Sequence, residues 1–158
     1  MIPGMRDDLP YAATLEVRDR CLCLHVQRAA RALARRFDEA LRPFGLTNGQ
    51  FSLLMSLNRP EPPRISDLVE LLAMDRTTLT AALKPLTRRG LVEVRRDEKD
   101  ARSRRLLLSA EGETVLAQAL PVWRATHEEV DALLASPDKV EDLRQDLNAI
   151  SRTGAESA

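Results

Sequence analysis

Aromatic residues are scarce in this sequence, at 3% of 158 residues, so aliphatic side chains must build most of any hydrophobic core. No run of 18 apolar residues occurs, which argues against a membrane-spanning helix. The first twenty residues lack the apolar stretch and small-residue cleavage site of a secretory signal. We therefore expect a cytoplasmic protein with no membrane partner.

Cysteine is nearly absent as well, and the only two residues, Cys21 and Cys23, form a Cys-x-Cys pair. No second Cys or His pair lies nearby, so the sequence predicts no metal site. Residues two apart on a helix point to roughly opposite sides, which disfavours a disulfide within one chain. Two interpretations stay open: inert, partly buried side chains, or redox-sensing thiols that pair across subunits.

Enzymatic features are missing. The two histidines, His25 and His127, lie far apart in the chain, and there is no nucleophile motif, glycine-rich phosphate loop or metal-ligand spacing. The sequence therefore predicts neither an enzyme nor a cofactor.

The net charge of zero hides a local asymmetry. Residues Arg76 to Arg105 carry ten basic and four acidic side chains, which leaves fourteen basic and twenty acidic residues elsewhere. A basic surface on a mildly acidic body is typical of a protein that approaches phosphates with one part only.

Helical periodicity dominates the N-terminal third. Apolar residues recur at steps of three and four over Leu15–Leu41, which predicts one long amphipathic helix that Pro43 and Gly45 end. Thr47 and Gln50 then form a capping box for a second, shorter helix.

Two short capped helices follow. We expect Ser66 to cap the first and Asp75 the second, with the turn Ala73–Met74 between them and Gly90 as a left-handed residue at the end. This pattern is typical of a helix-turn-helix.

The hydrophobic period changes to two after Gly90, which predicts a hairpin whose polar tip runs from Asp97 to Ser103. Ser109 should cap a long helix that breaks at Ser136–Asp138. A last helix should reach about Ile150, and residues 151–158 should form a frayed tail. The fold class is thus mainly α with a small β-hairpin wing.

The residue types on the second short helix and the hairpin suit DNA: arginine reads guanine, and threonine contacts base edges through its hydroxyl or methyl group. Arg88 and Arg89 suit phosphates. The candidate DNA-binding residues are Arg76, Thr77, Thr78, Thr80, Ala81, Lys84, Arg88, Arg95, Lys99, Arg102 and Arg104.

Several motifs together resemble the MarR family of bacterial regulators over nearly all of Leu15 to Ile150. They are Ile65-Ser66-Asp67-Leu68, Met74 to Thr80, Leu86 to Val92, Asp97-x-x-Asp100-x-Arg102 and Leu108-Ser109-x-x-Gly112. The resemblance implies an obligate homodimer whose first and last helices intertwine, and whose two winged helices straddle a pseudo-palindromic operator in double-stranded DNA. It also implies that Arg102 enters the minor groove, steadied by Asp100.

The resemblance and the element pattern divide the chain into three parts: residues 1–45 and 110–158 for dimerisation, and 46–109 as the winged helix-turn-helix. Three positions depart from the family pattern. Ala73 replaces a common glycine, which predicts a less sharp turn, and Pro85 and Pro121 each remove a backbone hydrogen bond within a helix.

The family resemblance favours a repressor that a small aromatic or anionic effector releases. Such effectors often bind between the dimer helices and the winged helix, where His25, Arg28, Trp123 and His127 are candidate pocket residues. Two alternatives remain: a redox-sensing regulator that uses Cys21 and Cys23, or a winged helix that binds protein instead of DNA.

Overall fold

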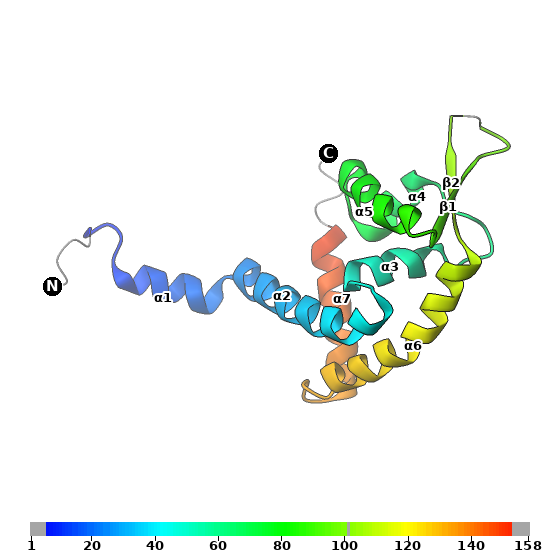
Figure 1. Ribbon diagram of the computed structural model, residues 1–158. Coiled ribbons are helices and arrows are strands. Elements are labelled where there is room, and N and C mark those ends of the chain that lie inside the picture. Colours follow the sequence, from blue (N-terminus) through cyan, green and yellow to red (C-terminus); the bar gives the residue numbers. More distant parts are fainter. Residues whose placement is uncertain (1–5, 101, 153–158) are drawn as a thin grey trace. The chain divides into compact units, whose positions relative to one another are not determined.

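The computed structural model describes residues 6–100 and 102–152, which fall into two compact units, Met1–Arg36 and Phe37–Ala158 (Figure 1). The first unit holds α1 (Tyr11–Arg20) and most of α2 (Leu22–Leu41). The second contains the remaining elements, which are η1 (Arg42–Phe44), α3 (Asn48–Leu57), α4 (Ile65–Leu72), α5 (Arg76–Arg88), β1 (Val92–Arg96), β2 (Arg104–Leu108), α6 (Ala110–Asp131) and α7 (Pro137–Arg152).

The first unit corrects one prediction, because Leu15–Leu41 does not form a single helix. The chain leaves the helical conformation at Cys21, where ψ is 106°. Cys21 then starts α2: its Sγ accepts the Leu24 N–H at 3.4 Å and its carbonyl oxygen accepts the His25 N–H at 3.2 Å. The hydrophobic period continues across this break, so periodicity alone could not reveal it. Cysteine is also an unusual residue at the N-cap position of a helix.

Leucine dominates the core of the second unit, as the shortage of aromatic residues predicts. The largest fully buried side chains come from helices α2 to α5 and from β2; they are Leu41, Leu54, Leu68, Leu79, Leu86 and Leu106. Two of the few aromatic residues meet across α3 and α6, where the rings of Phe51 and Trp123 stack with centroids 5.7 Å apart. This core holds α3, α4, α5 and the hairpin as one body.

Most of the predicted caps are confirmed. Thr47 and Gln50 form both bonds of the capping box at the start of α3. Asp75 accepts the Thr78 N–H at 2.9 Å at the start of α5, and Ser109 accepts the Gly112 N–H at 3.0 Å at the start of α6. Each cap is encoded by residues three apart, which is why sequence alone identifies it.

The prediction for Ser66 is wrong. Helix α4 begins at Ile65, so Arg64 is the N-cap residue, and the Asp67 carboxylate accepts the Arg64 backbone N–H at 2.8 Å. Asp67, at the third helical position, thus bonds back to the N-cap residue, and the Ser66 hydroxyl does not serve as the cap.

The turn between α4 and α5 is sharp despite the alanine, contrary to the prediction. Ala73 adopts a left-handed conformation, with φ 49° and ψ 43°. Its N–H is bonded to the Glu70 carbonyl oxygen and the Met74 N–H to the Val69 carbonyl oxygen, at 3.3 and 3.2 Å. These bonds and the packing of α4 against α5 hold an alanine in a conformation that glycine adopts more easily.

The C-terminal helices also differ in their bounds. Helix α6 ends at Asp131, five residues before the predicted break, so Leu133 and Leu134 lie in the connection. Helix α7 begins at Pro137, a position where proline loses no helical hydrogen bond. It includes Ser151 and Arg152, which the sequence placed in the tail; residues 153–158 lie outside the described part of the chain.

Strands β1 and β2 form an antiparallel hairpin, in which Val92 lies opposite Leu108 and Arg96 opposite Arg104. The loop before α4 extends this sheet: Arg64 bridges to Arg105, and the Leu106 N–H is bonded to the Pro63 carbonyl oxygen at 3.0 Å. Strand β2 is thereby attached to the loop before α4, and Gly90, with φ 72°, turns the chain from α5 into β1.

Candidate nucleic-acid interface

Helix α5 presents its polar side to solvent because its apolar side is buried. Leu79, Leu83 and Leu86 are 0%, 6% and 0% exposed. All seven of its predicted DNA-binding residues are exposed, namely Arg76, Thr77, Thr78, Thr80, Ala81, Lys84 and Arg88. Pro85 lies within the helix without interrupting it.

Two threonines of α5, Thr78 and Thr80, use their hydroxyl groups in hydrogen bonds within the protein. The Thr78 hydroxyl donates to Asp75 at 2.6 Å, and this bond, with the Thr78 N–H, holds the pKa of Asp75 below its usual value. The Thr80 hydroxyl donates to the Arg76 carbonyl oxygen at 2.7 Å. Both side chains can therefore offer a methyl group or an oxygen lone pair to a base, while their hydroxyl hydrogens stay within the helix.

Arg89, which the sequence analysis suggested for phosphates, makes a contact within the protein. Its Nη1 donates to the Gly45 carbonyl oxygen at 2.6 Å, just after η1. Gly45 is left-handed, with φ 65°, and a Cβ there would lie 3.1 Å from Arg89 Nη2. The end of α5 is thus attached to the turn before α3.

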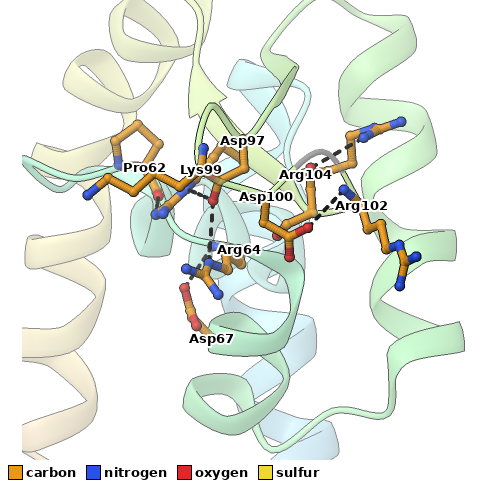
Figure 2. Close-up of polar contacts among 10 residues, drawn as sticks. Pro62, Arg64, Asp67, Asp97, Lys99, Asp100, Arg102 and Arg104 are labelled. Atoms are coloured by element: carbon orange, nitrogen blue, oxygen red, sulfur yellow. Dashed lines mark hydrogen bonds and ion pairs between the residues drawn. The ribbon is translucent and has the colours of Figure 1, made fainter.

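At the tip of the wing, Asp100 contacts the backbone of Arg102. Its Oδ1 accepts the Arg102 N–H at 3.0 Å, and its carbonyl oxygen accepts the Ser103 N–H at 2.9 Å. This turn fixes the chain from which the exposed Arg102 side chain extends (Figure 2). Asp100 thus contacts Arg102 through the peptide group, and its role in steadying the Arg102 side chain stays a prediction.

The start of the wing turn, just after β1, holds an ion cluster around a buried carboxylate, which was not predicted from the sequence. Asp97 is 5% exposed, and its Oδ2 lies 2.7 Å from Arg105 Nε and 3.5 Å from Arg64 Nε. Its Oδ1 accepts the Lys99 N–H at 2.9 Å. That bond, and then the contacts with Arg105 and Arg64, hold the pKa of Asp97 below its usual value, so the carboxylate is charged at neutral pH.

Arg105 connects this cluster to the rest of the unit. Its Nη1 donates to the Pro62 carbonyl oxygen at 2.8 Å, in the loop before α4. Figure 2 shows Pro62, Arg64 and Asp97 grouped on one side of the wing turn and Arg102 and Arg104 on the other. The only sequence signal for the cluster is Asp97 itself, as the first residue of the Asp-x-x-Asp-x-Arg motif.

A basic hollow of about 250 Å³ brings the wing and α5 together. Arg76, the first residue of α5, lines it with Arg102 and Arg104 of the wing, and all three are predicted DNA-binding residues. Arg64 and Ser66 of the α4 start, which the prediction did not include, line it as well, and the remaining walls are Ile65, Asp100 and Ser103.

The other basic candidates of the wing lie elsewhere. Arg95 and Lys99 line a separate hollow with Pro62 and Arg105, and the Arg95 guanidinium pairs with Glu93 at 2.7 Å. These two residues are exposed, so they remain candidates for contacts outside the basic hollow.

The four effector-pocket candidates are divided between the units. His25 and Arg28 belong to the first unit and are exposed. Trp123 and His127 lie together in the second, with ring centroids 4.2 Å apart, and the Phe37 ring lies 4.7 Å from His127. His127 Nδ1 is buried without a hydrogen-bond partner among the described residues, and burial lowers the pKa of His127.

The two cysteines are free thiols at the junction of α1 and α2, where Cys21 is half-buried and Cys23 is exposed. Within residues 6–100 and 102–152, no three Cys, His, Asp or Glu side chains are grouped so that they could hold a metal ion. In the same ranges no helix has the length and apolarity needed to cross a membrane.

Comparison with known proteins identifies the architecture. The MarR family model matches residues 46–103, which include α3 to the tip of the wing. Among solved structures, the M. tuberculosis transcriptional regulator MosR in complex with DNA is 37% identical, with a TM-score of 0.77 over 87% of this chain and 98% of that one. The transcriptional repressor CouR, bound to a 23-mer DNA duplex, is 28% identical, with a TM-score of 0.77 over 85% and 95% of the two chains.

A curated relative agrees with the solved structures. The HTH-type transcriptional regulator YwoH of Bacillus subtilis is 32% identical over 95 residues, which are 60% of this chain and 69% of that protein. These relatives are regulators of transcription and not enzymes. The capped helix pair, the basic wing and these similarities lead to one conclusion: the chain belongs to the MarR family of winged-helix, DNA-binding transcriptional regulators.

Proposed function

We propose that this protein is a cytoplasmic homodimeric repressor that binds a pseudo-palindromic operator and blocks a promoter. The observation that carries the proposal is the basic hollow, in which Arg76 of α5 and Arg102 of the wing line one surface. In this proposal the exposed face of α5 reads bases in the major groove and Arg102 enters the adjacent minor groove. Relatives described as regulators in complex with DNA support it.

Exposed apolar side chains support the homodimer. In the first unit Tyr11, Val17 and Leu22 are 56%, 59% and 69% exposed, and on α7 Leu147 and Ile150 are 39% and 54% exposed. Large apolar side chains exposed on terminal helices are typical of a subunit interface. Light scattering at micromolar concentration should give the mass of a dimer, and a monomer mass would contradict the proposal.

Footprinting tests the operator, with the DNA upstream of the protein's own gene as the first candidate. A twofold-symmetric dimer should protect two half-sites about one helical turn apart. Affinity should fall steeply as salt is raised, because contacts with phosphates release counterions. A flat salt dependence, or no protected site, would favour the alternative in which this winged helix binds protein.

We also propose that a small aromatic or anionic effector releases the operator, with Trp123 and His127 as part of its site. Their adjacent rings can stack on an aromatic ligand, and the unpartnered His127 Nδ1 can bond to an acid or phenol group. A panel of aromatic carboxylates and phenols should contain a compound that raises the melting temperature and weakens operator binding. His127→Ala should reduce both effects of that compound.

Oxidation, with thiols that pair across subunits, is a second candidate signal. Cys23 is exposed and Cys21 is half-buried at the junction of α1 and α2, so an oxidant can reach at least one thiol of each subunit. If oxidation is the signal, a mild oxidant releases DNA from the wild-type protein, and Cys21→Ser or Cys23→Ser abolishes that release. If the thiols are inert, both variants respond as the wild type does.

A further inference from the structure

Arg64 belongs to both polar features of the wing region. Its guanidinium lies 3.5 Å from the buried Asp97 carboxylate, and the same side chain lines the basic hollow with Arg76 and Arg102. Its backbone is held twice, by the bridge to Arg105 and by the bond from its N–H to Asp67. The side chain therefore extends from a fixed point of the fold.

The Asp97 cluster leaves Arg64 with charge to spare. One carboxylate faces two guanidinium groups, and Arg105 is the nearer, at 2.7 Å against 3.5 Å to the same oxygen. The Arg105 side chain is 27% exposed, while that of Arg64 is 44% exposed. Arg105 thus supplies the closer ion pair, and Arg64 keeps a partly exposed side chain in the wall of the hollow.

The position of the hollow identifies the chemistry of its occupant. In a B-form duplex, a sugar-phosphate strand separates the major groove from the adjacent minor groove. A protein that places Arg76 in one groove and Arg102 in the other must let this strand pass between them. The space between them is the hollow, whose walls include four arginines, one carboxylate and the exposed Ser66.

We propose that this hollow binds a phosphate of the DNA backbone, with Arg64 as its principal ligand. The inference rests on the proposed operator binding and adds a contact to it. Guanidinium groups recognise phosphate oxygens through paired hydrogen bonds, and Asp97 orients the Arg64 guanidinium before DNA arrives. The contact carries no base information, and it sets the register between the two groove readings.

Neutral phosphate analogues test this contact directly. An operator is selected from random duplexes by the full-length protein, and single methylphosphonates then replace each phosphate in turn. Wild-type affinity should fall about tenfold at one position, between the bases read by α5 and the minor-groove flank. Arg64→Ala should lose a similar factor on the unmodified operator, lose nothing further at that position, and show a salt slope lower by about one.

Arg59→Ala is the matched control, because Arg59 is an exposed loop arginine outside the hollow. This variant should keep the full sensitivity to the methylphosphonate. Arg104→Ala, which removes another arginine of the hollow, should show partial loss of sensitivity, and it serves if Arg64→Ala proves unfolded. The inference is overturned if no single position affects the wild type, or if a folded Arg64→Ala stays as sensitive as the wild type. If Arg64→Ala is unfolded, full sensitivity of Arg104→Ala overturns it. Failure of the wild type to select any duplex would instead refute the proposed operator binding.

Discussion

Asp97, which follows β1, and Arg105 of β2 connect the two sides of the wing beside its tip, through a 2.7 Å contact between Oδ2 and Nε. We expect Asp97→Asn to leave the dimer folded but to loosen the wing, because the neutral amide lacks the charge that holds Arg105. Operator affinity should fall about tenfold, with most of the loss in preference for A·T pairs at the flank that the wing reaches. Combining Asp97→Asn with Arg102→Ala should cost less than the sum of the two, since Asp97 acts through the wing.

The Asp97 contact also predicts a pH dependence. The pKa of Asp97 in the folded protein lies below its ordinary value of 3.8, so its stabilising effect is present above that value and is lost as the pH falls through the folded pKa. The stability difference between wild type and Asp97→Asn should therefore be constant near neutral pH and shrink below about pH 4. Chemical denaturation at neutral pH and below pH 4 measures this difference. Glu98→Gln, which removes an exposed neighbouring charge, should not change the free energy of unfolding comparably at either pH.

If Arg76 and Arg102 read different grooves, their alanine variants should lose base preference at different positions of the operator. Arg102→Ala should weaken operator binding by about 1–3 kcal/mol and relax preference at flanking A·T positions. Arg76→Ala should cost a similar amount and relax preference within the half-site. Selection from randomised duplexes would measure both profiles. Wild-type affinity in both variants at physiological salt would contradict the assignment and favour a protein partner.

Gly112 lies where α6 approaches the start of β1, and a Cβ there would lie 2.3 Å from the Leu91 carbonyl oxygen. Gly112→Ala must therefore shift backbone, and we expect it to lower the free energy of unfolding by about 1–3 kcal/mol. A Cβ at Gly49, in the first turn of α3, would instead meet no heavy atom of the described residues within 4 Å. Gly49→Ala should stabilise the protein by about 0.5–1 kcal/mol, and urea denaturation distinguishes the two outcomes.

Ala73 offers the opposite experiment. Its left-handed φ of 49° costs an alanine about 1 kcal/mol relative to glycine, so Ala73→Gly should raise the free energy of unfolding by up to about that amount. The greater freedom of glycine in the unfolded chain offsets part of the gain. Ala132→Gly, at an ordinary φ of −65°, should lower stability. Equal effects from the two substitutions would show that the Ala73 conformation carries no strain.

Local signals explain what the sequence predicted correctly. The caps at Thr47, Asp75 and Ser109 each depend on two residues three apart. The left-handed Gly90 is predicted by its position after the end of a helix. The buried face of α5 follows from its own period. Where a local rule had a competitor, the prediction was wrong: Asp67 caps α4 instead of Ser66, and a cysteine interrupts the expected first helix.

Contacts between distant residues could not be predicted in this way. Asp97 meets Arg64 only because β2 pairs with the loop before α4, and no spacing in the chain encodes that meeting. The same holds for the hydrogen bond from Arg89 to the Gly45 carbonyl oxygen. This bond gives a structural contact to an arginine that was expected to contact phosphates. The predicted DNA-binding residues of α5 and the wing are exposed, whereas the contacts that support them from inside were not predicted.

The pairing of β1 with β2 also limits which insertions and deletions the wing can accept. Neighbouring residues on a strand point to opposite faces, so the register that sends Arg104 to the basic hollow sends Arg105 to Asp97 and Pro62. Deleting or inserting one residue in β2 would exchange these two faces and move every side chain beyond it to the wrong side. Substitutions at the tip can accumulate one at a time, whereas changes of strand length cannot, and the wing can be expected to vary in composition while keeping its length.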